Sequence, residues 1–542
     1  MPEPQAQASP PRPPEPPPQP PEPARGISRR QFTARAAGAL VALGAAGAAG
    51  YEINAADGTV TVDNPYAKRA EPDEGSNARL GPAPGTPGSG LERFVTRPDL
   101  LPPHINLNEL AAAGTPPQSS PRFIALTPVS DGNFDGSQRG PMLIDRRGRL
   151  VWFQPINGSA FDFNIQSYRG RPTLTWWQGT VVQGHGIGTA IFADDRYRTI
   201  ASIPSRNGVP IDIHELTLTP QGTALVSSFP VADTDLTAVG GEGNGQVLAG
   251  HALEIDVRTG KVLFDWNSLD HVGIEESYAP YTGTRVPYDY FHLNSISPTE
   301  DGNLLISARH TWCIYKISRS TGAVIWRMNG KRSDFQLAPD ARFSWQHDAR
   351  QRGSQMTVFD NANHNGNPVA QGSRALLLNV AERARRVTLE RAYQDPARFS
   401  SQAEGNVQML PGGNVFVAWG FQPYLSEFAS DGKLLSSGQF QSAARSYRAF
   451  LVDWVGHPGG RPAVVATANP VGGFVVYASW NGATEIDHWT VLAGPNPQSL
   501  EPVGAQPWSG FETAIAVNTN GPLFVAVAYD RNGTELGRSE VA

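Results

Sequence analysis

The 542-residue chain contains a single cysteine, Cys313. One thiol excludes an intramolecular disulfide and any zinc site built from several cysteines. The chain also lacks a large excess of charge of one sign. It has 44 Lys and Arg and 50 Asp and Glu, which gives a formal net charge of −6. A strongly basic patch is the electrostatic mark of a nucleic-acid-binding protein, and this balance does not favour one. We therefore expect no nucleic-acid partner.

Helical patterning and long hydrophobic runs are missing as well. After residue 122, no stretch of helix length repeats its apolar residues at the spacing of an amphipathic helix. The Ala/Gly-rich run at 36–50 is only weakly apolar and is short for a membrane span, which needs about 20 residues. What the chain has instead is 56 glycines, 47 prolines and 12 tryptophans. This profile is typical of a turn-rich β protein with aromatic packing.

Residues 1–50 are predicted to be a leader that does not belong to the fold. Residues 1–24 are Pro-rich and polar and cannot bury a core. The paired arginines of SRRQF then precede the weakly apolar run, which looks like a twin-arginine export signal; the alternative is a chance Arg pair before a flexible linker. We expect the twin-arginine machinery to export the folded protein to an extracytoplasmic location, secreted or on the cell surface.

The fate of this leader stays open between two outcomes. The first is cleavage, near Gly50, and the second is retention of 36–50 as a weak membrane tether. No cysteine follows the run, which excludes a lipoprotein anchor. Residues 51–121 are then predicted to form a Pro/Gly-rich linker, with one docked stretch around FVTRPDLLPPHINL.

From residue 122 onward, short apolar runs alternate with tight-turn signatures such as EDGN, STGA and PGGN. Glycine in these turns supplies a positive φ at no steric cost. The turns recur in four-strand units with a period of about 40–50 residues, which is the pattern of propeller blades. Unit starts lie near Phe163, Ile213, Phe291, Trp345, Gly405 and Tyr447.

The sequence therefore predicts an all-β fold with a six-bladed β-propeller at 122–460. The last unit has one clear strand, YRAFLVDWV, and its partners are expected at 122–155, so that pairing between the two ends closes the ring. Seven blades are also compatible with the spacing. After Gly460 the repeat stops, and 461–542 alternates like a small β-sandwich of immunoglobulin or fibronectin type. We interpret this part as an accessory domain.

Three histidines share one position in the repeat. His214, His292 and His347 each lie six residues before the first residue of the following turn. The first strands of propeller blades line the central channel, and their starts meet at one mouth. A single histidine on a strand is usually structural, but three at one register favour a shared site.

Other polar residues are predicted to lie at the same mouth. Asn294 is two residues after His292 and is expected to face the same side. Arg309 ends the return strand and is expected to come back near His292, with the adjacent His310 facing the other way. Further candidates are Asn363 with His364, Asn406 with Glu404, Asp348 as a partner that holds an imidazole tautomer, and, more weakly, His185 in the Gly-rich turn QGHGIG.

Three histidines, an asparagine and an arginine suit two kinds of site. Imidazoles are good ligands for zinc, copper or iron, but no carboxylate shares the register and an arginine disfavours a neighbouring cation. An anion site fits better, because Arg offers a planar fork to sulfate or phosphate oxygens, and Asn and protonated His add donors. A neutral histidine there could be a nucleophile, with others as acid/base groups and oxyanion stabilisers. No G-x-S-x-G elbow is present in the sequence.

The segments that carry these residues resemble the PAPS-independent aryl sulfotransferases, in particular the branch found in actinobacteria and fungi. They are DIHELTLTPQGTALVS, YDYFHLNSISPTEDGNLLISARHT, RFSWQHDAR and FDNANHN, and their order and spacing agree with the family. The resemblance covers about residues 122–460. It implies a six-bladed propeller that moves a sulfuryl group from a phenolic sulfate ester to a phenol. The implied route is ping-pong through a sulfohistidine, with no nucleotide donor, cofactor or metal.

The resemblance also implies a role for each matching residue. His347 of QHD would be the nucleophile, and His214 of IHE would be the general acid/base toward the phenol oxygen. His292 and Asn294 of HLN would bind sulfuryl oxygens or assist proton transfer, and Arg309 of SARH would stabilise the negative charge of the transferring group. We add Asn363 and Asn406 as substrate-binding candidates at the rim.

The chain departs from the best-studied enterobacterial-type members, which are dimers with a different N-terminal domain and a disulfide. Dimerisation and the range of substrates therefore do not carry over. Two alternatives come from other classes of protein. One is a non-catalytic exported propeller that binds ligands or cell-wall partners, and the other is a metal-dependent lyase or hydrolase on the same ring.

Overall fold

A computed structural model describes residues 51–53, 60–62, 90–109, 121–130, 136–206, 209–283, 285–364, 367–368 and 372–542. The predicted export signal, its possible tether at 36–50 and most of the predicted linker lie outside these ranges. Within them, no helix is both long enough and apolar enough to cross a membrane. The helical segments are single 3₁₀ turns: η3 (Thr237–Val239), η4 (Ser268–Asp270), η5 (Ile274–Glu276) and η6 (Pro339–Ala341).

The fold is all-β, as the turn-rich repeat predicts, and six of its sheets contain four antiparallel strands in meander order. The first sheet has β7 (Ser159–Tyr168), β8 (Arg171–Val182), β9 (His185–Ala193) and β10 (Thr199–Pro204). The second has β11 (Leu216–Leu218), β12 (Thr223–Ser228), β15 (His251–Asp256) and β16 (Val262–Asn267). The third has β17 (Leu293–Pro298), β18 (Leu304–Ala308), β19 (Cys313–Ile317) and β20 (Val324–Met328).

The other three sheets repeat this plan with additions. The fourth has β22 (His347–Arg352), β23 (Gln355–Asp360), β26 (Arg374–Ala381) and β27 (Arg386–Tyr393), with β21 (Gln336–Leu337) on its edge. The fifth has β28 (Asn406–Met409), β29 (Val415–Ala418), β30 (Tyr424–Phe428) and β31 (Leu434–Phe440), with β3 (Ile105–Glu109) on its edge. The sixth joins β32 (Ala444–Val452) to β4 (Phe123–Ser130), β5 (Met142–Asp145) and β6 (Leu150–Phe153).

Three short pairs complete the strands of this region: β1 (Tyr51–Ile53) with β2 (Val60–Val62), β13 (Val231–Thr234) with β14 (Gly245–Leu248), and β24 (Asn363–His364) with β25 (Asn367–Pro368). The strand β3 falls within the stretch that the sequence predicts to dock. Its Ile105, together with Leu100 before it, is buried against the fifth and sixth sheets.

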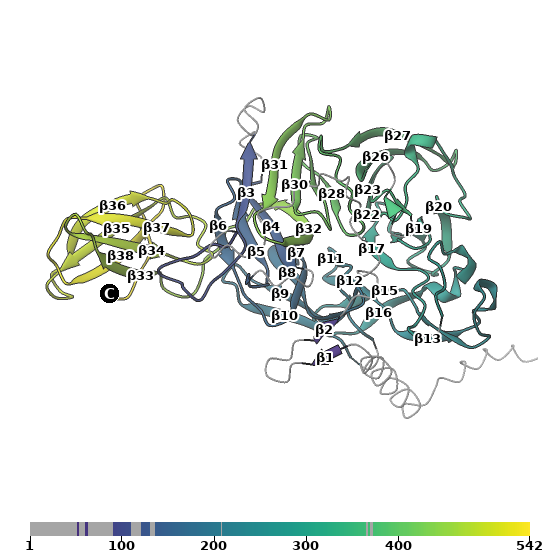
Figure 1. The fold of residues 1–542 in the computed structure, drawn as a ribbon, viewed down its shortest axis with the longest axis horizontal. Helices are drawn as coiled ribbons and strands as arrows, with labels where there is room; N and C mark the ends of the chain where they lie inside the picture. The colour runs from purple at the N-terminus through teal and green to yellow at the C-terminus, as the bar shows by residue number, and fades with distance from the viewer. Residues whose placement is uncertain are drawn as a thin grey trace, which may run out of the picture.

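The six sheets follow one another around a closed, propeller-like ring (Figure 1). The innermost strands of neighbouring sheets touch in the order β17, β22, β28, β32, β7 and β11, and between the second and third sheets β12 touches β17. The predicted closure is present, because β32 pairs antiparallel with β4 from the other end of the ring. In the described part of the chain, an apolar cluster lies between each neighbouring pair of sheets, so each sheet buries both faces.

Four of the innermost strands contain a register shift at the level where the polar residues lie. The shifts fall within β7, β17, β22 and β32. Asp162, His292 and Asp348 have φ values of 54°, 54° and 53° at or beside these shifts. A bulge re-aims side chains and interrupts alternation. Because the shift in β17 lies between Leu293 and Ser295, strand alternation cannot place Asn294 on the same side as His292, as the sequence analysis expected.

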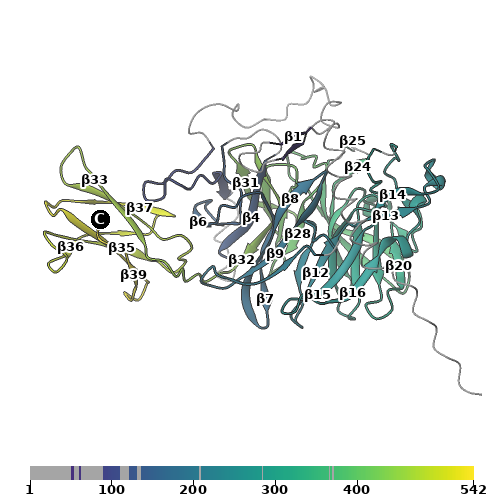
Figure 2. The ribbon, with the colours of Figure 1, turned by 90° about the horizontal axis from the view of Figure 1, so that it is seen from below.

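The C-terminal part forms two further sheets that enclose a common apolar core beside the ring (Figure 2). One sheet has β33 (Ala463–Ala468), β34 (Phe474–Ser479) and β37 (Glu512–Val517). The other has β36 (Glu501–Pro507), β35 (His488–Gly494), β38 (Leu523–Tyr529) and β39 (Glu535–Arg538). Asn481 ties this part to the ring, because its side chain accepts from Phe153 N at 3.0 Å and donates to Phe153 O at 2.9 Å.

Candidate active site

The three histidines at the shared register converge. His214 and His292 lie with ring centroids 4.7 Å apart. The buried Tyr447 links them to the third, since its ring is 5.8 Å from His214 and 6.5 Å from His347. All three imidazoles are buried. The equal spacing to the turns therefore brings together residues from β22 and from the segments before β11 and β17.

Two further histidines belong to this cluster. The ring of His185 lies 5.0 Å from His292 and 5.7 Å from His214. The ring of His310 lies 4.8 Å from His292, and its Nε2 is 2.9 Å from Nη2 of Arg309. The prediction that His310 faces away from Arg309 is wrong, because β18 ends at Ala308 and both residues lie in the following turn, where alternation does not apply.

Two carboxylates back the histidines, and sequence reasoning missed both. Asp212 accepts from Nδ1 of His214, and Asp289 accepts from Nδ1 of His292. Asp289 also contacts Nε2 of His185 at 3.0 Å. No carboxylate shares the register of the histidines, as expected, but these two reach the cluster from the residues before it. The available signal was the spacing in DIH and DYFH, where an aspartate precedes the histidine by two and three residues.

These contacts set different proton affinities within the cluster. Burial lowers the pKa of His214 and His292 below the ordinary value; Asp212 and Asp289 oppose this, and Arg309 adds to it at His292. Burial also lowers the pKa of His310, to about 4. At His185, burial is outweighed by Asp289 and Asp212, which together raise its pKa. The cluster thus contains one imidazole that holds its proton more readily beside several that release theirs.

His347 has a different environment, with no carboxylate on its ring. Its Nδ1 lies 2.7 Å from Oδ1 of Asn361, and its Nε2 accepts the backbone N–H of Glu404 at 3.2 Å. Burial, followed by the charge of Arg309, holds the pKa of His347 well below its ordinary value. The imidazole is therefore neutral at neutral pH, as a nitrogen nucleophile must be.

The prediction that Asp348 holds an imidazole tautomer is wrong. Its carboxylate accepts from Arg350 Nε at 2.8 Å and from Val407 N at 3.1 Å. The positive φ of Asp348 turns its side chain away from the histidine that precedes it.

Arg309 supplies a positive charge that no acid neutralises directly. Among the described residues, no carboxylate forms an ion pair with its guanidinium, and its buried Nε has no hydrogen-bond partner. The guanidinium stacks over the ring of Trp345 at 5.0 Å. Burial lowers the pKa of Arg309 to about 10, which leaves it charged at neutral pH. A planar cation with unused donors beside neutral imidazoles is suited to bind an oxyanion.

The three predicted asparagines have different surroundings. Asn294 is fully buried, and its Nδ2 donates to Gln346 O at 2.7 Å, directly before the nucleophile candidate His347. Asn406 uses both side-chain atoms on the backbone of Ala449, at 2.9 Å and 3.0 Å, so we reassign it from substrate binding to holding β28 against β32. Asn363 is buried in β24, and its role in binding stays a prediction.

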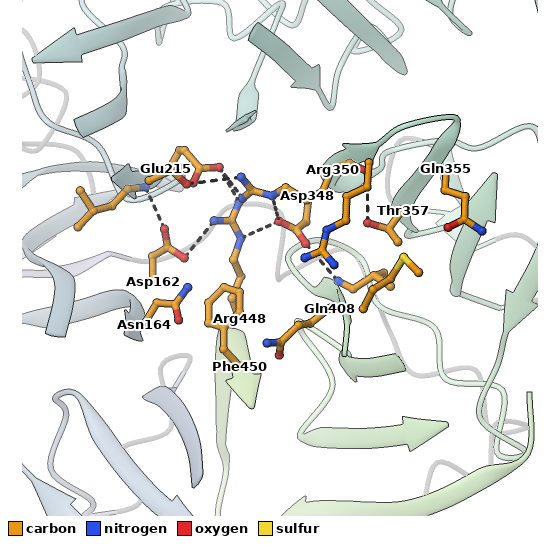
Figure 3. Close-up of a pocket in the computed structure, with 15 residues that line it drawn as sticks. Asp162, Asn164, Glu215, Asp348, Arg350, Gln355, Thr357, Gln408, Arg448 and Phe450 are labelled. Atoms are coloured by element: carbon orange, nitrogen blue, oxygen red, sulfur yellow. Dashed lines mark hydrogen bonds and ion pairs between the residues drawn. The ribbon is translucent and has the colours of Figure 1, made fainter. Parts of the chain in front are cut away.

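A network of buried charges lies next to the histidines (Figure 3). Arg448 pairs with Asp162 at 3.0 Å and Glu215 at 3.4 Å, and donates to Asn294 O at 2.8 Å. Arg350 joins Glu215 to Asp348, at 2.8 Å each. These side chains border a polar cavity of about 230 Å³. At three places the residue before a network member belongs to the histidine cluster: His214 before Glu215 ahead of β11, His347 before Asp348 in β22 and Tyr447 before Arg448 in β32.

Two groups of side chains bring together the donor types that a metal ion would use. His185 with Asp212 and His214, and His185 with Asp289 and His292, place their ligand atoms within 4.8 Å of one another. The Nδ1 atoms of His214 and His292 already face carboxylates, however, and the charge of Arg309 disfavours a cation nearby. The arrangement suits an anion better than a metal.

Residues 164–441, just over half of the chain, match the sequence pattern of the arylsulfotransferase (ASST) family. The chain belongs to this family. The match spans Arg309 and the five histidines of the cluster, His347 among them, and it ends just before Tyr447 and Arg448. Arylsulfotransferase chemistry requires a site for a sulfate ester. The guanidinium of Arg309, which forms no ion pair with a carboxylate of the described residues, is in line with such a site.

Solved structures with a similar chain path are distant from this arylsulfotransferase. A protein of unknown function from Bacteroides caccae is 13% identical, with a TM-score of 0.37, and the match covers 61% of this chain and 98% of that one. An inactive variant of virginiamycin B lyase from Staphylococcus aureus is 9% identical, with a TM-score of 0.32 and coverage of 70% and 97%. Likeness at this level says nothing about activity. No curated protein matches the chain.

Proposed function

We propose that this arylsulfotransferase is PAPS-independent and moves a sulfuryl group from a phenolic sulfate ester to a phenol through a sulfohistidine on His347. The observation that carries the proposal is the charged, unpaired guanidinium of Arg309 in the same cluster as the neutral imidazole of His347. Membership of the family supports the reaction class. The order of segments supports placement in the actinobacterial and fungal branch.

In the proposed first half-reaction, the Nε2 lone pair of His347 gives up its hydrogen bond from Glu404 N and attacks the ester sulfur. The bond between sulfur and the phenolic oxygen breaks, and its electron pair stays on that oxygen. Arg309 binds the non-bridging oxygens, whose negative charge it stabilises. We assign proton donation to the leaving oxygen to His214, backed by Asp212, with the protonated His185 beside it as the source of the proton.

In the second half-reaction, an acceptor phenol occupies the place of the released one. His214 takes the phenol proton, the phenolate oxygen attacks sulfur, and the N–S bond breaks to return the lone pair to Nε2. The same acid/base group thus serves both halves, as reversibility requires. The scheme uses residues of this chain only.

The finer description of the fold belongs to the same proposal. We propose that the six sheets of the ring are the blades of a six-bladed β-propeller, with β32 completing the last blade. The two C-terminal sheets have the strand number and common core of a small β-sandwich of immunoglobulin or fibronectin type. In this arrangement the inner strands deliver the histidines to one mouth of the channel.

Removing the charge of Arg309 is expected to slow transfer strongly. In Arg309→Ala, kcat with 4-nitrophenyl sulfate and phenol should fall by about 10²–10³-fold, because the sulfuryl oxygens lose their main charge partner. Arg309→Lys should recover part of the rate, since it restores the charge but not the fork. Arg198→Ala, at an exposed ion pair, is the control and should leave the rate unchanged. A rate within threefold of wild type in Arg309→Ala would contradict the assigned role.

The proton affinities predict a bell-shaped dependence of kcat/KM on pH for a donor with a poor leaving group, such as phenyl sulfate. His347 must be neutral, and its pKa is lowered, so its acidic limb should lie below the ordinary imidazole value of 6.5. His185, the source of the proton that His214 donates, must be charged, and its pKa is raised, so the alkaline limb should lie above 6.5. His185→Gln should remove the alkaline limb and keep the acidic one. An acidic limb above pH 6.5 in the wild type would refute this assignment.

A further inference from the structure

We infer that Asn361 is a positioning residue that fixes the Nδ1-protonated tautomer of His347 and so aims the Nε2 lone pair at the sulfuryl group. The inference rests on the proposed function, because it takes His347 as the group that attacks sulfur. It goes beyond it by assigning a residue that neither the repeat register nor the resemblance singles out.

The hydrogen bonds of Asn361 define which way its amide points. The residue follows β23 and is fully buried. Its Nδ2 donates to two backbone carbonyls, Ser401 O and Glu404 O, at 3.1 Å each. Carbonyl oxygens accept hydrogen bonds but cannot donate them, so the NH₂ end of the amide must face these two atoms. The remaining end, Oδ1, therefore faces Nδ1 of His347 at 2.7 Å.

An amide oxygen beside a ring nitrogen requires a proton on that nitrogen. The neutral imidazole carries one N–H and one lone pair, so a proton at Nδ1 leaves the lone pair at Nε2. A second contact requires the same tautomer independently. The backbone N–H of Glu404 points at Nε2 from 3.2 Å, and an N–H can donate only to an unprotonated nitrogen. Both ring nitrogens of His347 thus have a defined state.

The backbone of Asn361 is held in place as well, through its carbonyl oxygen. Ser373 Oγ donates to Asn361 O at 2.9 Å and accepts from Ser401 N at 2.8 Å. The carbonyl of Ser401 that receives the Asn361 amide is therefore part of the same closed set of bonds. Rotation of the asparagine would leave buried groups unpaired, which costs about 1–3 kcal/mol for each group.

The kind of partner separates His347 from the proton-handling histidines. The Nδ1 atoms of His214 and His292 face carboxylates, which stabilise an imidazolium and favour proton uptake. Asn361 orients the ring of His347 in the same way but adds no charge. Burial and the charge of Arg309 lower the pKa of His347 more than the hydrogen bond to Asn361 raises it, so the ring stays neutral. A neutral partner also adds no negative charge to hold the positive ring of the sulfated intermediate, which must react again with the acceptor.

Other charges around His347 do not replace this function. The titratable or charged groups near its ring are Arg309, His214, Tyr447, Arg448 and Glu404, whose carboxylate pairs with Arg445. Arg309 and Arg448 disfavour protonation of the ring but do not select which nitrogen carries the hydrogen. Asn361 is the side chain that contacts Nδ1.

The tautomer can be observed without turnover. In full-length protein labelled with ¹⁵N-histidine, the resonances of His347 are identified by their loss in His347→Gln, and their shifts show which nitrogen is protonated. We expect wild type to show a protonated Nδ1 and an unprotonated Nε2 at neutral pH. A protonated Nε2 would overturn the inference, whether or not the enzyme transfers sulfuryl groups.

Kinetics of two Asn361 variants supply the second readout. Asn361→Asp keeps the shape but puts a carboxylate on Nδ1, so the acidic limb of kcat/KM should move up by at least about one pH unit. Asn361→Ala should lower kcat by about 10–100-fold with little change in KM, because the lone pair is no longer held at Nε2. A merely structural role would not move the acidic limb.

Asn406→Ala is the matched control, since Asn406 is equally buried and also binds backbone but does not contact a histidine. It should cost stability and leave the acidic limb in place. An unchanged limb in a folded Asn361→Asp would overturn the inference. If the tautomer is as expected but no sulfated protein forms, the proposed function fails while the positioning role of Asn361 stands.

Discussion

Replacing His347 with alanine is expected to reduce sulfuryl transfer by about four to six orders of magnitude, to the level of a protein without a nucleophile. The neutral imidazole is the only group in the proposed scheme that bonds to sulfur, and its Nδ1 faces a neutral amide rather than a carboxylate. His214 and His292 are held by aspartates and suit proton transfer.

The measurement is steady-state release of 4-nitrophenol with phenol as acceptor, together with circular dichroism to confirm folding. His457→Ala is a suitable control, because this histidine lies at an exposed pair with Asp195 and should keep full activity. A folded His347→Ala that retains more than about a tenth of the wild-type rate would contradict the assignment of the nucleophile.

Replacing Arg448 with methionine is expected to cost about 3–5 kcal/mol of stability. Arg448 is 1% exposed and pairs with two carboxylates that are buried with it, Asp162 and Glu215. Its removal leaves the buried Asp162 without its cationic partner and leaves Glu215 with Arg350 alone. Burial already raises the pKa of Asp162 to about 6 with Arg448 present, and Arg448 is the largest influence that lowers it. In Arg448→Met, Asp162 should therefore take up a proton at neutral pH.

Urea unfolding followed by tryptophan fluorescence measures this loss as a lower midpoint for the ring. Arg538→Met is the control, because Arg538 forms an exposed pair with Glu535 that should contribute less than about 1 kcal/mol. Adding Asp162→Asn to Arg448→Met should recover part of the stability, since it replaces the buried carboxyl group that has lost its partner. A loss below about 1 kcal/mol in Arg448→Met would show that the network does not hold the inner strands together.

The architecture of the ring could be predicted because its signals are local and repeat. Turn glycines and alternating strands mark each sheet, and the single strand at Tyr447 predicts closure onto the N-terminal strands. The register of His214, His292 and His347 predicts that the three meet. Each of these conclusions depends on spacing along the chain, which the repeat preserves.

The rest of the site depends on contacts that spacing does not encode. Asp289 reaches His292 and His185 because the segment before β17 folds back beside the start of β9. His310 joins Arg309 because the strand stops one residue earlier than alternation assumes. Asn361 reaches His347 because it directly follows β23, which pairs with β22, and the hairpin was not followed to this residue in the sequence. Asn406 lies at the register of a rim residue, but its side-chain amide is hydrogen-bonded to the backbone of β32.

The most direct test of the account is the mass of the intact protein after brief incubation with 4-nitrophenyl sulfate and no acceptor, quenched at alkaline pH. The account predicts an adduct of about 80 Da, one sulfuryl group, that maps to His347 and disappears on addition of phenol. The absence of an adduct, with no 4-nitrophenol released across several phenolic sulfate donors, would contradict transfer through a sulfohistidine.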